Sequence, residues 1–293
     1  MPLRIADLPT GAKVKFGAYQ VSDEEPHKIC WVKVHHDNTF LSEFLEDQCA
    51  FDAKEPEHEN EYRRAYGNNR YSVSNVNQFI NSEEPDWFSP TTPTDTPPIN
   101  DYLYDRKNGY RHKPGFLHLF APWELEAIDL SCVKTALPKM DITRVEEKSE
   151  EINARVFLPS KFNLTGEKEN GVEEGEFWDY FKNGASIECP LSPECFAFGE
   201  CDEKPDEEED GWYYNLRSPC AGYAYGVRFV GRCGGVFNCD AYDGFMGLRP
   251  ALKINPEILI SDEPDCDGYY EVLETAMEAI EIPEDEFIAL LKI

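Results

Sequence analysis

Two short blocks of unusual composition bound the segment from Trp212 to Leu252. The first reads Trp212-Tyr213-Tyr214-Asn215-Leu216-Arg217-Ser218-Pro219, and the second reads Gly247-Leu248-Arg249-Pro250-Ala251-Leu252. Each block carries one arginine among apolar residues, next to serine or proline. A guanidinium group in such surroundings donates to backbone carbonyls or to buried carboxylates. We therefore expect Trp212, Arg217 and Arg249 to be structural, with the two arginines holding the neighbouring loops.

The two blocks resemble the terminal motifs W-(Y/W)-L-R-(S/T)-P and G-(V/L)-R-P-A-L of a widespread bacterial and phage family. That family is related to the C-type lectin fold, which is also used by formylglycine-generating enzymes and by the variable proteins of diversity-generating retroelements. Looser matches lie at residues 15–19, 29–31, 79–81, 115–117 and 156–160, so the resemblance covers roughly residues 10–255. This sequence departs from the pattern in the additional Tyr214-Asn215 and in an acidic insert before Trp212.

The resemblance implies an α+β fold, a C-type-lectin-like domain with a twisted antiparallel sheet, two helices and long loops. Residues 1–255 are then a ligand-binding domain, and residues 256–293 are an acidic C-terminal extension. The tripeptides of calcium-dependent lectins, Glu-Pro-Asn and Gln-Pro-Asp, are absent from residues 212–252. Their near matches at residues 84–86 and 263–265 lie in other parts of the chain. We therefore do not expect sugar binding through calcium.

Residues 220–245, between the two blocks, contain no Lys, Glu, Gln, Trp or Met. These five types make up 64 of the 293 residues of the whole chain, so about six are expected in this segment. All residue types present belong to the set that pyrimidine-ending codons encode. Mutagenesis of the adenines in AAC or AAT codons, the signature of diversity-generating retroelements, reaches only that set. We hypothesise that the segment is a diversified binding surface; the alternative is a glycine-rich sheet that excludes long charged side chains.

The side chains of this segment suit a binding surface. Tyrosine among glycines is typical of antibody-like binding sites, because a rigid aromatic ring gives contact area at low entropic cost. The predicted ligand contacts are Tyr223, Tyr225, Phe229, Arg232, Phe237, Asn238, Cys239, Asp240, Tyr242, Asp243 and Phe245. Strand alternation would place Tyr223, Tyr225, Val227 and Phe229 on one face, while Val227, Val230 and Val236 are the better core residues. Burial of Tyr223, Tyr225, Phe237 and Tyr242 would instead favour a purely structural role.

Local patterns predict the other elements. Alternation predicts strands at residues 13–19 and 29–34, and the turn-like stretch between them makes these a hairpin or two neighbouring strands. Helical spacing predicts a helix at residues 72–81, capped by Ser72 or Ser74, and Pro122 begins another at residues 122–128. Five prolines make residues 84–100 a loop. We also expect a strand at residues 154–160, a solvated loop at residues 202–210, and helices at residues 174–181, 269–280 and 284–292.

The charge of the chain is strongly acidic and unevenly distributed. Lys and Arg number 28 against 57 Asp and Glu, a net charge of −29, which argues against nucleic-acid binding. Residues 216–253 nevertheless hold five basic and two acidic residues, a net charge of +3. The sequence has no long apolar run and no signal-peptide pattern, so we expect no membrane insertion and a location in a phage virion or the bacterial cytoplasm. The ten cysteines are expected to be free thiols.

Neither metal binding nor catalysis is indicated by a motif. Cys189, Cys195 and Cys201 have a C-x5-C-x5-C spacing that matches no zinc pair. His35 and His36 are adjacent, and adjacent residues of a strand face opposite ways, which makes them a poor chelating pair. The sequence lacks an EF-hand, G-x-S-x-G, H-E-x-x-H and a phosphate-binding loop. We therefore predict a non-enzyme with neither a cofactor nor a metal.

The function we expect is recognition of a protein or cell-surface ligand through residues 220–246. The chain would be a phage or prophage-encoded variable protein, with virion or homo-oligomer contacts but no nucleic-acid partner. One alternative is a structural virion or assembly protein without a variable site. The other is an oxidase of the formylglycine-generating type, which needs a cysteine pair that Cys233 and Cys239 would have to supply.

Overall fold

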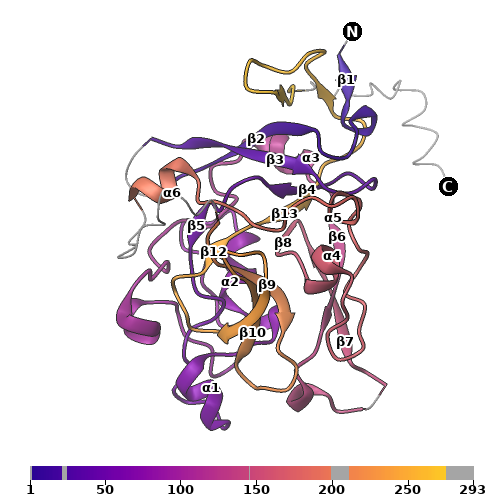
Figure 1. Ribbon diagram of the computed structural model, residues 1–293. Helices are drawn as coiled ribbons and strands as arrows, with labels where there is room; N and C mark the ends of the chain where they lie inside the picture. Colours follow the sequence, from indigo (N-terminus) through magenta and orange to yellow (C-terminus); the bar gives the residue numbers. More distant parts are fainter. Residues whose placement is uncertain (1, 22–24, 145, 199–210, 275–293) are drawn as a thin grey trace, which may run out of the picture.

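A computed structural model describes residues 2–21, 25–144, 146–198 and 211–274 (Figure 1). Helices and sheets are mixed in an α+β arrangement. The larger sheet has six strands in the order β15-β2-β3-β4-β13-β8. Its strands are β2 (Lys13–Tyr19), β3 (His27–Lys33), β4 (Thr39–Ser42), β8 (Val156–Phe157), β13 (Ala251–Lys253) and β15 (Tyr269–Glu271). All neighbours are antiparallel except β15 and β2, which are parallel.

The second sheet has five strands in the order β11-β10-β9-β12-β5. Its strands are β5 (Asp47–Gln48), β9 (Tyr214–Pro219), β10 (Gly226–Val230), β11 (Val236–Asp240) and β12 (Gly247–Leu248). The first arginine block supplies β9. The second block supplies β12 and then, after Arg249-Pro250, β13 of the six-stranded sheet. The second block therefore connects the two sheets.

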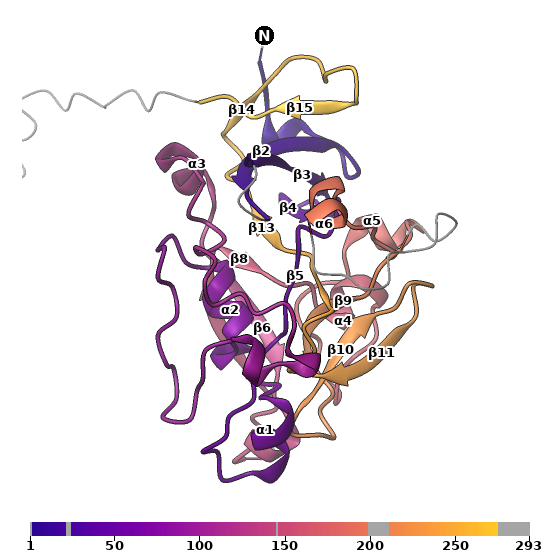
Figure 2. The ribbon, with the colours of Figure 1, turned by 90° about the vertical axis from the view of Figure 1, so that its left-hand side faces the viewer.

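Shorter elements surround these sheets. Two-stranded ladders join β6 (Ser131–Ala136) to β7 (Ser149–Ala154) and β1 (Leu3–Arg4) to β14 (Leu259–Ile260). The α-helices are α1 (Glu61–Tyr66), α2 (Asn75–Ile80), α3 (Pro122–Ala127), α4 (Lys161–Thr165), α5 (Asp179–Lys182) and α6 (Pro193–Phe198). Figure 2 shows β14 and β15 beside β2 at one end of the molecule and α1 at the opposite end.

The local patterns were right for several elements. β2 and β3 pair as an antiparallel hairpin, one of the two predicted arrangements. The Ser74 side chain caps α2 by accepting the N–H of Asn77, and Pro122 occupies the first turn of α3. Residues 84–99 contain neither helix nor strand, as their prolines predicted. These elements follow from short-range steric and hydrogen-bonding rules, which is why sequence alone finds them.

Other predictions were wrong. The described residues form six short α-helices rather than two, and the helix expected at residues 174–181 begins only at Asp179. The strand expected at residues 154–160 is reduced to β8, because Ala154 ends β7 instead. Residues 269–271 are a strand rather than a helix. Residues 272–274 are not helical either, and residues 275–280, the helix expected at residues 284–292 and the loop expected at residues 202–210 lie outside the described residues.

The strand β15 replaces the expected helix because an edge of the larger sheet is open to it. Tyr269 lies beside Lys13 in a parallel ladder, and its hydroxyl donates to Glu43 Oε2 at 2.6 Å. Lys15 Nζ lies 2.5 Å from Asp265 Oδ2. Pairing with β2 gives hydrogen-bond partners to the backbone N–H and C=O groups of residues 269–271. A helix of this acidic stretch would have to make those hydrogen bonds within itself. Residues 257–274 thus add two strands to the body of the domain.

One continuous core lies between the sheets and the helices. Its largest fully buried side chains include Phe16, Trp31, Phe40, Tyr71, Tyr110 and Tyr214. None of the nine cysteines within the described ranges forms a disulfide. In the same part of the chain, no helix has the length and apolar character needed to cross a membrane.

Candidate recognition surface

The eleven predicted contact residues all keep some solvent exposure. Tyr223 is 51% exposed, Phe237 is 49% exposed and Asn238 is also exposed, while the other eight are half-buried. Val227 and Val230 are fully buried, as predicted, and Val236 is half-buried. In this segment Val227 and Val230 therefore lie in the core, whereas the aromatic rings are at least partly exposed at the surface.

The expected single face of alternating residues is not formed. Tyr223 and Tyr225 lie in the turn before β10, and Val227 is buried whereas Phe229 is not. The pairing of β10 with β9 shifts register between Val227 and Phe229, and such a bulge breaks simple alternation. The aromatic residues consequently fall into two groups.

The first group, which we name the edge cluster, comprises Trp212, Tyr213, Phe229, Arg232 and Phe237. Phe229 and Phe237 are partners across β10 and β11, with ring centroids 5.8 Å apart. The Arg232 guanidinium lies over the rings of Trp212 (4.2 Å) and Tyr213 (5.1 Å). Because β11 is the outer strand of its sheet, Phe237 and Asn238 stand on an accessible edge.

The second group, which we name the tyrosine surface, comprises Tyr62, Tyr66, Tyr104, Tyr223, Tyr225, Tyr242 and Phe245. Neighbouring ring centroids are 4.9–6.1 Å apart, in an unbroken series from Tyr223 through Tyr225, Tyr66, Tyr242 and Tyr104 to Phe245. Tyr62 stacks on Tyr225 at 5.6 Å. Three of the seven rings come from outside residues 220–246.

Sequence reasoning missed those three residues. Tyr62 and Tyr66 lie four positions apart on α1, where they face the same way, and Tyr104 follows in a 3-10 turn. The spacing of Tyr62 and Tyr66 was a readable signal for a shared helix face. Nothing in the sequence, however, indicated that this face meets a turn 160 residues further along the chain.

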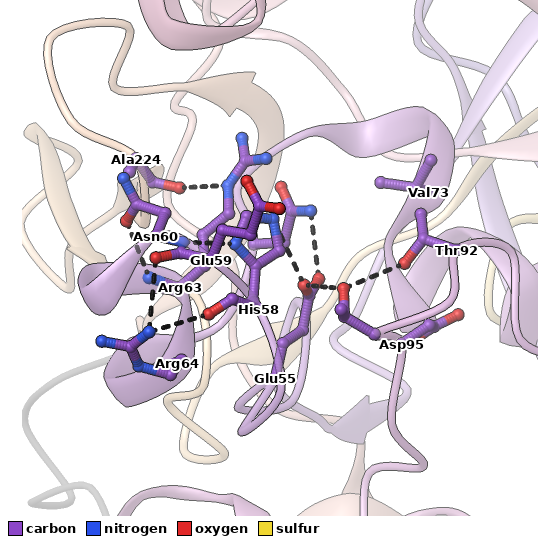
Figure 3. A network of polar contacts seen from close by, with 12 residues as sticks. Glu55, His58, Glu59, Asn60, Arg63, Arg64, Val73, Thr92, Asp95 and Ala224 are labelled. Carbon is purple, nitrogen blue, oxygen red and sulfur yellow. Dashed lines mark hydrogen bonds and ion pairs between the residues drawn. The ribbon is translucent and has the colours of Figure 1, made fainter.

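Polar contacts join α1 to the turn that carries Tyr223 and Tyr225, and Figure 3 shows those of Asn60, Arg63 and Ala224. Asn60 caps α1 by accepting the N–H groups of Tyr62 (2.9 Å) and Arg63 (3.2 Å). Arg63 then donates from Nε to the Ala224 carbonyl (3.1 Å), which lies between Tyr223 and Tyr225. Asn69 donates to the carbonyls of Tyr223 (3.0 Å) and Gly226 (2.8 Å).

Backbone hydrogen bonds join the remaining parts of this surface. The Tyr242 N–H donates to Tyr66 O (3.1 Å), and the Tyr104 N–H donates to Tyr242 O (3.0 Å). The Ala241 N–H donates to Tyr225 O (2.9 Å). The rings therefore project from backbones that are bonded to one another, so little ordering entropy remains to be lost on binding.

Two open pockets flank the central rings. One of about 420 Å³ is lined by Lys54, Asp101, Leu103, Tyr104, Asp105, Arg106 and Tyr242. The other, of about 380 Å³, is lined by Asn60, Tyr62, Met140, Ala221, Gly222, Tyr223, Ala224 and Tyr225. Burial raises the pKa values of the Asp240 and Asp243 carboxyls above their ordinary value. The second pocket, with three tyrosines, has the aromatic walls and few polar groups of a usual recognition site, whereas four of the seven residues that line the first are charged.

The arginine blocks hold the scaffold behind this surface. Arg217 is buried and donates to the carbonyls of Leu158 (2.7 Å), Glu174 (2.6 Å) and Lys134 (3.1 Å). The Glu174 carboxylate lies beside it and accepts from the Ala136 N–H (2.9 Å) and the Ser218 hydroxyl (2.5 Å). These bonds tie β9 to β6 and to the loop before α5.

Arg249 of the second block and Trp212 of the first also hold backbone carbonyls. Arg249 donates to the carbonyls of Ser42 (3.2 Å) and Ile187 (3.2 Å) and to the Tyr214 hydroxyl (3.0 Å). Trp212 is buried and donates from Nε1 to Phe245 O (3.0 Å). Both arginines thus hold carbonyls, the geometry expected of residues that pin loops.

The expectation that His35 and His36 face opposite ways was wrong. It assumed a strand, but β3 ends at Lys33 and both histidines lie in the following turn. Their ring centroids are only 4.1 Å apart. A turn can bring adjacent side chains together, whereas a strand separates them.

Together these features define an α+β domain in which the tyrosine surface and the edge cluster lie at opposite ends of the paired strands β10 and β11. Residues 37–256 match the family described as "Domain of unknown function (DUF6273)". The chain belongs to that family. No curated protein and no solved structure matches the chain.

Proposed function

We propose that this chain is a ligand- or receptor-recognition protein with a C-type-lectin-like fold that binds a protein or cell-surface ligand without catalysing a reaction. Its binding site is residues 220–246 together with Tyr62, Tyr66 and Tyr104. The observation that carries the proposal is the partial exposure of all eleven contact residues while Val227 and Val230 fill the core. A purely structural segment would bury its aromatic rings first.

Recognition in this proposal rests on aromatic contact area. The tyrosine surface supplies rigid rings, and the edge cluster adds Phe237 and Arg232. Asn238, Asp240 and Asp243 contribute hydrogen bonds at the margin. Residues 220–246 hold Arg228 and Arg232 against Asp240 and Asp243, so this region is electrically balanced within a strongly acidic chain.

We also propose that the chain is a phage or prophage-encoded variable protein of a diversity-generating retroelement, acting in a virion or in the bacterial cytoplasm. The absence of five residue types from residues 220–245 supports this origin. The structure sharpens the expected pattern, because buried positions such as Val227, Val230 and Ala241 cannot vary freely.

The gene neighbourhood tests this origin. We expect a near-identical repeat of the 220–246 coding segment beside a reverse transcriptase gene. Differences between the copies should fall at adenines of the repeat and at codons of the eleven contact residues, with the Val227, Val230 and Ala241 codons unchanged. A genome without such a repeat would overturn diversification and leave a fixed recognition or assembly surface.

A further inference from the structure

A second cluster of chemically capable side chains lies away from the aromatic groups. His35 and His36, in the turn between β3 and β4, meet Glu176 in the loop before α5. One ligand atom of each residue lies within 4.8 Å of the other two. His35 is buried, whereas the side chains of His36 and Glu176 are 69% and 70% exposed. The cluster is therefore anchored at one residue and open to solvent at two.

We propose that His35, His36 and Glu176 bind a divalent transition-metal ion of the zinc type. Two ligands bonded to tetrahedral zinc at about 2.0–2.1 Å lie about 3.3 Å from each other. His35 Nε2 and Glu176 Oε2 are 3.2 Å apart, which matches that separation. Imidazole nitrogens with a carboxylate oxygen suit zinc and its neighbours rather than calcium or magnesium, which prefer oxygen ligands alone.

Asp179 gives this site an outer carboxylate. Its Oδ2 lies 2.9 Å from His35 Nδ1 and 2.8 Å from His36 Nδ1. At His36 the carboxylate can accept Nδ1–H, which leaves Nε2 available to a metal and makes that nitrogen more basic. At His35 the hydrogen bond in this structure is donated by the Asp179 backbone N–H to Nδ1 (3.3 Å). A metal on His35 Nε2 therefore requires the ring proton on Nδ1, where the Asp179 carboxylate lies 2.9 Å away to accept it.

A bound ion would keep an accessible coordination position. His35 and Glu176 line a pocket of about 180 Å³, with Lys134 and Lys253 also in its wall. Three protein ligands beside an open pocket leave room for a water molecule or an anion as the fourth ligand. The ion would also join the turn after β3 to the loop before α5, two segments separated by 140 residues.

Zinc titration of the full chain tests the proposal. After treatment with a chelator, calorimetry should show one zinc ion per chain at this site, and zinc should raise the unfolding temperature. His36→Ala and Glu176→Gln change exposed side chains and should fold normally, yet each should weaken binding at least tenfold. Asp179→Asn, which removes the outer carboxylate, should weaken it by about 10- to 100-fold.

Free thiols also bind zinc, so the controls must separate the two. His112→Ala, at an exposed histidine elsewhere, and Cys132→Ala, at a thiol of the same pocket, should both bind like the parent. With Co²⁺ as the probe, a tetrahedral visible spectrum without sulfur-to-cobalt charge transfer is expected. Unchanged binding in both His36→Ala and Glu176→Gln, or a thiolate spectrum lost in Cys132→Ala, would overturn the proposal.

Discussion

The Nε atom of Arg63 lies 3.1 Å from the carbonyl oxygen of Ala224 and holds the turn that carries Tyr223 and Tyr225 against helix α1. The same buried guanidinium reaches Asp141 Oδ2 through Nη2 at 2.6 Å. One side chain therefore connects α1, the turn before β10 and the segment after β6. This bond makes the tyrosine surface a single unit rather than two separate aromatic patches.

Arg63→Lys should destabilise the protein, because a lysine can keep the ion pair with Asp141 but cannot also donate from Nε. Leaving the Ala224 carbonyl without a partner should lower the free energy of unfolding by about 1–3 kcal/mol. Denaturant unfolding measures this change. Arg64→Ala, at the exposed neighbour, is the control and should cost less than about 0.5 kcal/mol. Equal losses in the two variants would contradict the anchoring role of Arg63.

Gly67 ends α1 with φ +81°, and a Cβ there would come within 2.8 Å of the Asp52 carbonyl oxygen. Gly67→Ala should therefore strain the helix end that positions Tyr66 and lower the unfolding free energy by at least about 1 kcal/mol. Gly222→Ala is the matched control, since nothing lies within 4 Å of its added Cβ. Thermal unfolding of the two variants decides the point: similar melting temperatures would show that the α1 terminus tolerates a side chain.

Burial raises the pKa of the Glu174 carboxyl above its ordinary value of 4.5, although Arg217 opposes the shift. The folded chain then keeps a proton that the unfolded chain loses. The stabilisation is complete below about pH 4.5 and is lost as pH rises towards the folded pKa. Glu174 should make the free energy of unfolding of the parent fall over this window by up to about 1.4 kcal/mol per pH unit. Glu174→Gln lacks this contribution, so its free energy of unfolding should fall less steeply. Parallel pH profiles of parent and variant would refute this assignment.

Exposed rings of the proposed surface should be replaceable without loss of the fold. Tyr223→Ser and Phe237→Ser should each change the free energy of unfolding by less than about 1 kcal/mol. Tyr214→Ser, at a fully buried ring of β9, should cost about 3–5 kcal/mol. Denaturant midpoints compare the three. A large loss in the first two variants would assign those rings to the core and support the assembly-protein alternative.

Local sequence signals located much of the scaffold. The hairpin of β2 and β3 follows from alternation, α2 from the Ser74 cap, and α3 from Pro122. The apolar surroundings of Arg217 and Arg249 indicated that they would hold carbonyls. Each of these inferences depends on residues within a few positions of one another, or on chemistry that a buried guanidinium must satisfy wherever it lies.

Sequence patterns gave wrong predictions where contact with a distant segment outweighs the local conformational preference of the chain. Residues 269–271 become a strand because the edge of β2 is available. His35 and His36 come together because β3 ends two residues before them. In both places the decisive interaction is with a neighbour that spacing alone does not identify.

By itself, the sequence determined that residues 220–245 carry a ring-rich, lysine-free segment between two arginine blocks, because composition and local chemistry are properties of the chain. Only the tertiary structure decided that Tyr62, Tyr66 and Tyr104 complete that segment's surface. It also decided that Glu176 and Asp179 meet His35. These contacts depend on long-range packing. Each segment by itself is compatible with many arrangements, and the bulge in β10 and the hydrogen bond from Arg63 to Ala224 select one of them.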